Sequence, residues 1–168
     1  RRHRVDPRKN LPDPMEQFDA IVIGGGVIGT SIACHLARFG VGRVLLLERG
    51  QLGGGTTAQS SCIVRTHYSV SANVALAQAA LAIFRDFPNY LEDPEADCGL
   101  HRCGLMLVAP EGERATALRE TLALQHRAGI PAQEIDAGEA QRIHPLLNLD
   151  DNPVIGWEPG AGYADAYM

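Results

Sequence analysis

Long apolar runs and aromatic residues are scarce in this chain of 168 residues, of which 5% are aromatic. The most apolar window, residues 20–36, is interrupted by three consecutive glycines at 24–26. Because a membrane-spanning helix needs about 18 or more consecutive apolar residues, we expect no membrane span. Basic residues are fewer than acidic ones, 15 against 20, and five of the 15 lie within residues 1–14. The rest of the chain is therefore acidic, which argues against a nucleic-acid-binding surface.

Cysteine is too rare for a disulfide framework, with four residues at positions 34, 62, 98 and 103. No apolar signal-peptide segment precedes the first predicted strand, so we expect a reducing, cytoplasmic location. Cys98 and Cys103 flank a single histidine and lack the second ligand pair of a closed zinc site, so no metal site is predicted. Residues 1–17 combine charges with three prolines, which predicts a disordered extension; a functional basic arm is the alternative.

The next segment predicts a strand, a helix and a second strand. Residues 19–23 form a short apolar run that leads directly into the glycines at 24–29. Ile28, Ile32 and Leu36 then recur at helical spacing, up to a predicted cap at Gly40. Residues 43–48 form a second apolar run, typical of a parallel strand covered on both faces. The pattern predicts a βαβ unit with a right-handed crossover.

Helices and strands continue to alternate downstream. A helix capped by Ser71 is expected to stop at Pro88 and to carry an apolar face formed by Leu76, Ala80, Ile83, Phe84 and Phe87. The other expected elements are a strand at 104–108, an amphipathic helix at 116–128 with Leu118, Leu122 and Gln125 on one side, a strand at 133–135, a short helix with a capping box at Asp136 and Glu139 that ends before Pro145, and a strand at 154–158.

The pattern Gly24-x-Gly26-x-x-Gly29 lies in the setting that binds a dinucleotide. Gly24 permits a tight turn, Gly26 lets backbone N–H groups approach a pyrophosphate, and Gly29 allows the helix to pack closely on the strands. Glu48 ends the second strand 19 residues after Gly29, where a carboxylate accepts hydrogen bonds from an adenosine ribose. The sequence therefore predicts a dinucleotide site, and this motif alone leaves NAD and FAD open.

A glycine- and hydroxyl-rich loop, residues 53–61, follows Glu48-Arg49 and precedes Ile63-Val64-Arg65-Thr66-His67-Tyr68. Together with the glycine pattern, these segments resemble the glycine/D-amino-acid oxidase (DAO) family of FAD-dependent amine oxidoreductases, and within it the branch of the sarcosine oxidase β-subunit and dimethylglycine dehydrogenase. The resemblance covers residues 18–168 and implies FAD as the cofactor.

The resemblance further implies that the loop lies along the phosphates and ribityl chain of FAD; from its composition alone, a flexible connector is the alternative. In the dimethylglycine dehydrogenase pattern a histidine of this loop is bonded to the flavin, but this chain has Gln59 there, so we expect no such bond. The predicted FAD-binding residues are Gly24, Gly25, Gly26, Val27, Ile28, Gly29, Glu48, Arg49, Thr56, Thr57, Ser60 and Ser61.

Arg65 is the predicted substrate-binding residue. It is the only lysine or arginine between Arg49 and Arg85, and a guanidinium can hold a carboxylate with two parallel hydrogen bonds. In amino-acid-oxidising members of the family an arginine at the matching position has that role. The alternative is that Arg65 ties down a flavin phosphate or a neighbouring loop. His67 is the weaker catalytic candidate, either a base near the flavin or a structural polar group.

We predict an α/β fold, with a Rossmann-like FAD-binding domain of the DAO type joined to part of a mixed-sheet substrate domain. The expected boundaries are 1–17 for the extension, 18–93 for the FAD-binding domain, 94–158 for the partial substrate domain and 159–168 for a return towards the FAD-binding domain. Chains of the family are roughly twice as long, which fits two intertwined domains. We therefore expect this stretch to be truncated and inactive by itself.

The predicted function is FAD-dependent oxidation of the C–N bond of an amino acid or secondary amine, by hydride transfer to the flavin. The expected partner is a small-molecule amine or amino-acid substrate; a partner subunit and the electron acceptor are left open. The alternatives are an NAD(P)-dependent dehydrogenase, which the glycine pattern also allows, and a nucleotide-binding remnant without activity.

Overall fold

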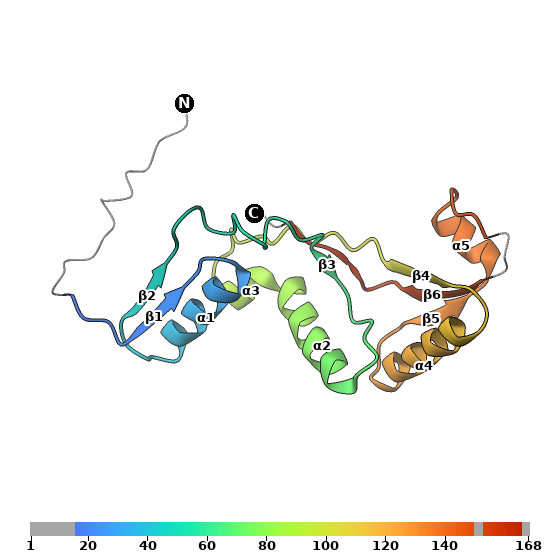
Figure 1. Ribbon diagram of the computed structural model, residues 1–168, viewed down its shortest axis with the longest axis horizontal. Helices are drawn as coiled ribbons and strands as arrows, with labels where there is room; N and C mark the ends of the chain where they lie inside the picture. Colours follow the sequence, from blue (N-terminus) through green and yellow to red (C-terminus); the bar gives the residue numbers. More distant parts are fainter. Residues whose placement is uncertain (1–15, 150–152, 166–168) are drawn as a thin grey trace, which may run out of the picture. The chain divides into compact units, whose positions relative to one another are not determined.

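The computed structural model describes residues 16–149 and 153–165, so the first 15 residues of the predicted extension lie outside the described residues. The chain divides into two compact units, one up to Gln59 and one from Ser60 onward. Their elements are labelled in Figure 1. The domain boundaries expected from the sequence stay a prediction.

The first unit contains the predicted βαβ arrangement. β1 (Ala20–Ile23) and β2 (Val44–Leu47) pair in parallel, and α1 (Val27–Arg38) connects them (Figure 1). Gly24 has a φ of 106°, and a Cβ atom added to Gly29 would collide with the carbonyl oxygen of Gly24. Glycine is therefore required at both positions, by the backbone conformation at the first and by the close helix–strand approach at the second, as the motif predicts.

Apolar side chains of the first unit are more exposed than the sequence predicts. No residue of α1 is buried, and Ile23, Ile28 and Phe39 are 85%, 73% and 79% exposed. Within the described residues β2 is not covered on both faces, and Leu47 at its end is 38% exposed, so that expectation is wrong here. The physical reason is that two strands and one helix are too few to enclose a two-sided sheet.

The second unit contains a three-stranded antiparallel sheet within the described residues. Its strand order is β4 (Leu105–Ala109), β6 (Val154–Glu158), β5 (Gln133–Ile135). Val154 belongs to the cluster packed under α4 (Glu113–Arg127), while Ile155 belongs to the cluster packed under α5 (Ala137–Ile143). Because successive strand residues point to opposite faces, the two helices cover opposite faces of the sheet (Figure 1). Leu118, Leu122 and Gln125 of α4 are buried, as predicted.

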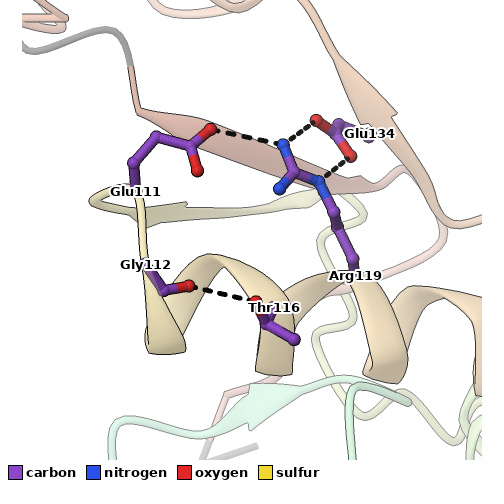
Figure 2. Close-up of polar contacts among 5 residues, drawn as sticks. All are labelled: Glu111, Gly112, Thr116, Arg119 and Glu134. Carbon is purple, nitrogen blue, oxygen red and sulfur yellow. Dashed lines mark hydrogen bonds and ion pairs between the residues drawn. The ribbon is translucent and has the colours of Figure 1, made fainter.

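Polar contacts link α4 to the sheet and cap the start of α5. Arg119 of α4 pairs with Glu134 of β5 through Nε at 3.0 Å and Nη2 at 3.1 Å, and its Nη2 lies 3.4 Å from Glu111 (Figure 2). This cluster is exposed, so it contributes little stability. At the start of α5, Asp136 Oδ1 accepts a hydrogen bond from the Glu139 N–H at 2.8 Å, which is the cap that the sequence predicts there.

Two expectations for the segment after the glycine loop are wrong. α2 (Ser71–Arg85) begins after Val70, and Ser71 is its first helical residue rather than its side-chain cap. Pro88 does not stop a helix but lies in the first turn of α3 (Phe87–Leu91), where a missing N–H costs nothing. The buried residues of α2 are Val74 and Leu81, whereas Leu76, which the predicted apolar face included, is 70% exposed.

Candidate functional site

Glu48 holds the glycine turn of the first unit. Its Oε2 accepts a hydrogen bond from the Gly25 N–H at 2.7 Å, and its Oε1 accepts one from the Gly50 N–H at 2.7 Å. These two hydrogen bonds, of which the one from Gly25 has the larger effect, hold the pKa of Glu48 below its usual value. A Cβ atom added to Gly25 would lie within 3.0 Å of Glu48 Cβ, so the turn and the carboxylate pack closely. The sequence predicts the ribose role of Glu48 and misses this structural one.

The glycine loop folds onto the same turn. The Gly53 N–H donates to the Gly25 carbonyl at 2.8 Å, and the Val27 N–H donates to Thr57 Oγ1 at 3.0 Å. Up to Thr57, the loop is therefore held against the start of α1 rather than being a free connector. Ser60 Oγ accepts a hydrogen bond from the Cys62 N–H at 3.0 Å, while Arg49, Thr56 and Ser61 are exposed.

The residues of the first unit fit a dinucleotide. Gly26 is the N-cap of α1 and supplies no side-chain cap, and the first turn of α1 carries no acidic residue. The positive end of the helix dipole is therefore not neutralised by a carboxylate in its own first turn, which suits a pyrophosphate. Glu48 keeps unused acceptor positions on both oxygens, which suits ribose hydroxyls. These groups therefore suit a dinucleotide, FAD included.

The predicted substrate segment lies in the second unit. β3 (Ile63–Val64) pairs antiparallel with β7 (Gly162–Tyr163), and the chain then leads into Arg65. Thr66, 1% exposed, donates to Glu158 Oε1 from its N–H at 2.8 Å and from its hydroxyl at 2.6 Å. Arg65 is half-buried, with its guanidinium carbon 5.2 Å from the ring centroid of Tyr68, a cation–π contact. Arg65 thus belongs to a segment that is fixed on both sides.

His67 points into a buried polar cluster that the sequence does not reveal as a site. Its Nδ1 lies 2.9 Å from Gln125 Oε1, and Gln125 Nε2 lies 3.2 Å from Glu158 Oε2. Burial lowers the pKa of His67, against the opposing effects of the Gln125 hydrogen bond and the Glu158 charge. Two signals were available in the sequence: a glutamine on the apolar side of the helix at 116–128, and a glutamate that ends an apolar strand.

Other candidate sites are not supported by the described part of the chain. Its four cysteines are free thiols, and burial raises the pKa of Cys98. No group of three or more His, Cys, Asp or Glu residues within 16–149 and 153–165 could hold a metal ion. Among the helices that the structure describes, none has the length and apolar character to cross a membrane. Trp157 packs against a core cluster.

Comparison with known proteins defines the class to which these features belong. A family model described as DAO, FAD dependent oxidoreductase, matches residues 19–168. The chain therefore belongs to the family of FAD-dependent oxidoreductases of the DAO type, and the predicted family, fold class and cofactor are confirmed.

Individual proteins show how much of a family member the chain represents. The sarcosine oxidase β-subunit of an Arthrobacter species is 27% identical over 160 residues, 91% of this chain and 38% of that protein. A solved structure of L-proline dehydrogenase from P. horikoshii superimposes with a TM-score of 0.80 at 25% identity and covers 90% of this chain and 39% of that one. The mitochondrial pyruvate dehydrogenase phosphatase regulatory subunit of Mus musculus is 28% identical over 135 residues, 80% of this chain and 15% of that protein. The chain thus spans about two fifths or less of these proteins.

Proposed function

We propose that the protein oxidises the C–N bond of an amino acid, with a secondary amine as the favoured substrate. Sarcosine and L-proline, which the names of two similar proteins specify, are both amino acids with a secondary amine. FAD, when bound, would supply a two-electron acceptor for a hydride that leaves a carbon bonded to the amine nitrogen. The nitrogen lone pair forms the C=N bond as the hydride leaves, and water then cleaves this bond to a carbonyl compound and an amine.

The observation that carries the proposal is the fixed position of Arg65. Thr66 anchors the segment to Glu158, and Tyr68 supports the guanidinium from one side. A guanidinium packed on a ring keeps N–H groups at its edge, and these can pair with a carboxylate in a planar, two-bond geometry. We assign Arg65 to the substrate carboxylate, and His67 to a polar role near the reacting nitrogen.

The cofactor residues of this proposal are those of the glycine turn and its neighbours. The glycine turn and the N-terminus of α1 are assigned to the pyrophosphate, and Glu48 is assigned to the ribose. Thr57, already bonded to the Val27 N–H, contributes a hydroxyl beside the phosphates. Arg49, Thr56, Ser60 and Ser61 are assigned to FAD binding on the family pattern.

The test is reduction of the bound cofactor by substrate. The purified full-length protein should carry flavin absorbance, and anaerobic mixing with sarcosine or L-proline should bleach it. A secondary amine of similar size without a carboxylate should bleach it far more slowly. Release of NAD(P) instead of FAD on denaturation would favour the dehydrogenase alternative and overturn the proposal. Equal bleaching by both amines would leave the amine chemistry standing and remove the carboxylate assignment.

A second candidate function is a regulatory one. The chain is 28% identical to a protein named as a regulatory subunit of pyruvate dehydrogenase phosphatase. One fold can serve different functions, so this similarity supports a regulatory role as the second candidate. Flavin that stays bound but is bleached by no amino acid or amine would favour this candidate.

We also propose a cytoplasmic location, supported by the four free thiols in an acidic chain. Cell fractionation with an antibody against the chain tests this, and recovery in a membrane or organelle fraction would contradict it. Co-purification with the same antibody under mild conditions would test whether the protein has a partner subunit.

A further inference from the structure

A cluster of three buried polar side chains lies in the second unit. Thr66, Gln125 and Glu158 are 1%, 0% and 2% exposed, and they come from the segment after β3, from α4 and from β6. Burial of a carboxylate and an amide is costly unless each polar atom finds a partner. All buried side-chain nitrogen and oxygen atoms of the described residues do have partners. The cluster is therefore a complete hydrogen-bond network, in which the chemistry of each group determines which atom donates and which accepts.

The carboxylate of Glu158 determines which end of the Gln125 amide faces it. A carboxylate offers only acceptors, and three donors converge on this one: the N–H and the hydroxyl of Thr66 on Oε1, and Gln125 on Oε2 at 3.2 Å. Gln125 must therefore present its NH₂ group to Glu158. The same NH₂ group lies 3.4 Å from Thr66 Oγ1, whose hydrogen already points to Glu158, so that oxygen is free to accept.

The orientation of Gln125 in turn determines which atom donates in its hydrogen bond with His67. With Nε2 towards Glu158, its Oε1 faces His67 Nδ1 at 2.9 Å. Since Oε1 only accepts, the hydrogen of this bond belongs to Nδ1. The neutral ring is therefore the Nδ1–H tautomer, and its Nε2 carries the lone pair. Nε2 makes no hydrogen bond to any residue in the described part of the chain, and the side chain is half-buried.

We propose that Glu158 and Gln125 are positioning residues that hold His67 as the Nδ1–H tautomer, so that Nε2 serves as the acceptor for the ammonium proton of the amine substrate. The second half of this proposal rests on the proposed function, while the first half does not. An ammonium group has no lone pair with which to form a C=N bond, so it must lose one proton before the hydride leaves. Nε2 takes that proton, the N–H electrons stay on nitrogen, and the product leaves as the iminium ion.

The charged groups around His67 act in opposite directions. Glu158 on β6 favours the protonated ring, Arg65 on the same segment disfavours it, and Gln125 on α4 is neutral. Burial outweighs the attraction by Glu158 and lowers the pKa of His67, so the ring is neutral and able to accept a proton at neutral pH. The pair of Arg65 and His67 would then bind both ends of a zwitterionic amino acid.

The tautomer is tested by long-range ¹H–¹⁵N correlation spectra of the full-length holoprotein. In the unmodified protein His67 should show a proton on Nδ1. Glu158→Gln removes the acceptor-only group while preserving size, so Gln125 is free to turn round. The Nδ1–H preference should be lost and the pKa of His67 should fall. Glu120→Gln, an exposed position on α4, is the matched control and should change neither. A proton on Nε2 of His67 in the unmodified protein would overturn the proposal without any variant.

The proton-transfer half is tested by the pH profile of anaerobic flavin reduction by sarcosine. The rate should rise with pH as His67 becomes neutral, and Glu158→Gln should move this limb to lower pH, in parallel with the pKa measured by NMR. A limb that stays in place while the NMR pKa moves would show that His67 does not take the proton. If no amino acid reduces the flavin but the tautomer is as described, the proposed function fails and the positioning role stands.

Discussion

The Glu48 carboxylate and the Gly25 N–H are joined at 2.7 Å across 23 positions of sequence, so one side chain links the end of β2 to the turn after β1. The residue expected to receive the ribose is thus also hydrogen-bonded to the glycine turn. Contact with the ribose and support of the glycine turn predict different losses of affinity, on replacement of Glu48, for ligands that contain only part of FAD.

Replacement of Glu48 should weaken adenine-nucleotide binding selectively. Glu48→Gln is expected to lower the affinity for FAD and for ADP by about tenfold or more, because a charge-assisted hydrogen bond to the ribose is lost. Affinity for FMN, which lacks the adenosine, should stay the same. Isothermal titration of the three ligands measures this, with Glu120→Gln as the control. Equal losses for all three would mean that Glu48 acts through the turn alone.

Gly29 should tolerate no side chain. In Gly29→Ala the added Cβ would collide with the Gly24 carbonyl oxygen, so α1 must move away from β1. We expect a loss of about 1–3 kcal/mol in the free energy of unfolding, measured by urea denaturation. Gly55→Ala, where an added Cβ would meet nothing within 4 Å, is the control and should cost much less. Similar losses for both variants would contradict the close helix–strand approach.

Stability should fall below pH 6.5 through His67. Its pKa in the folded chain lies below the usual 6.5, so in this range the unfolded chain binds a proton that the folded chain does not. The contribution is full above pH 6.5 and is lost as the pH falls through the folded-state pKa. His67→Gln should flatten this part of the stability profile in urea unfolding, whereas His126→Gln, at an exposed position, should not. Identical profiles for the two variants would contradict the prediction.

Arg65 should discriminate substrates by their carboxylate. In the full-length enzyme Arg65→Lys keeps the charge but loses the planar fork, so the KM for sarcosine should rise by about tenfold or more. The KM for a secondary amine without a carboxylate should change little. Arg119→Lys, exposed on α4, is the control for a general effect of the substitution. If both substrates suffer equally, Arg65 holds the flavin or the fold instead.

The local elements were predictable because their signals are local. The glycine pattern and the two apolar runs define β1, α1 and β2, and the apolar side of α4 follows from the spacing of Leu118 and Leu122. The predicted helix end at Pro88 was wrong because a proline that ends one helix and a proline that starts the next look alike in sequence. The expected face of α2 was wrong because the partners that select which face is buried lie elsewhere in the chain.

The candidate site was predictable only in part, for a different reason. Arg65 and Glu48 have types and neighbours that indicate a role, but the hydrogen bonds of Thr66 join it to a residue far along the chain. Sequence spacing carries no information about such pairs. Gln125 was placed correctly on the buried side of its helix, yet only the structure shows that it lies between His67 and Glu158.

The 92 positions that separate Thr66 from Glu158 also set an order of events during synthesis. A ribosome releases Arg65 and His67 long before it makes β6 and β7, and closing so long a loop is slow compared with local helix formation. The βαβ unit with its glycine turn relies on contacts within the first 59 residues and can form early. The segment around Arg65, which is proposed to bind the substrate, reaches its native geometry only after β6 and β7 have been made, so the turn proposed to bind the nucleotide forms well before it.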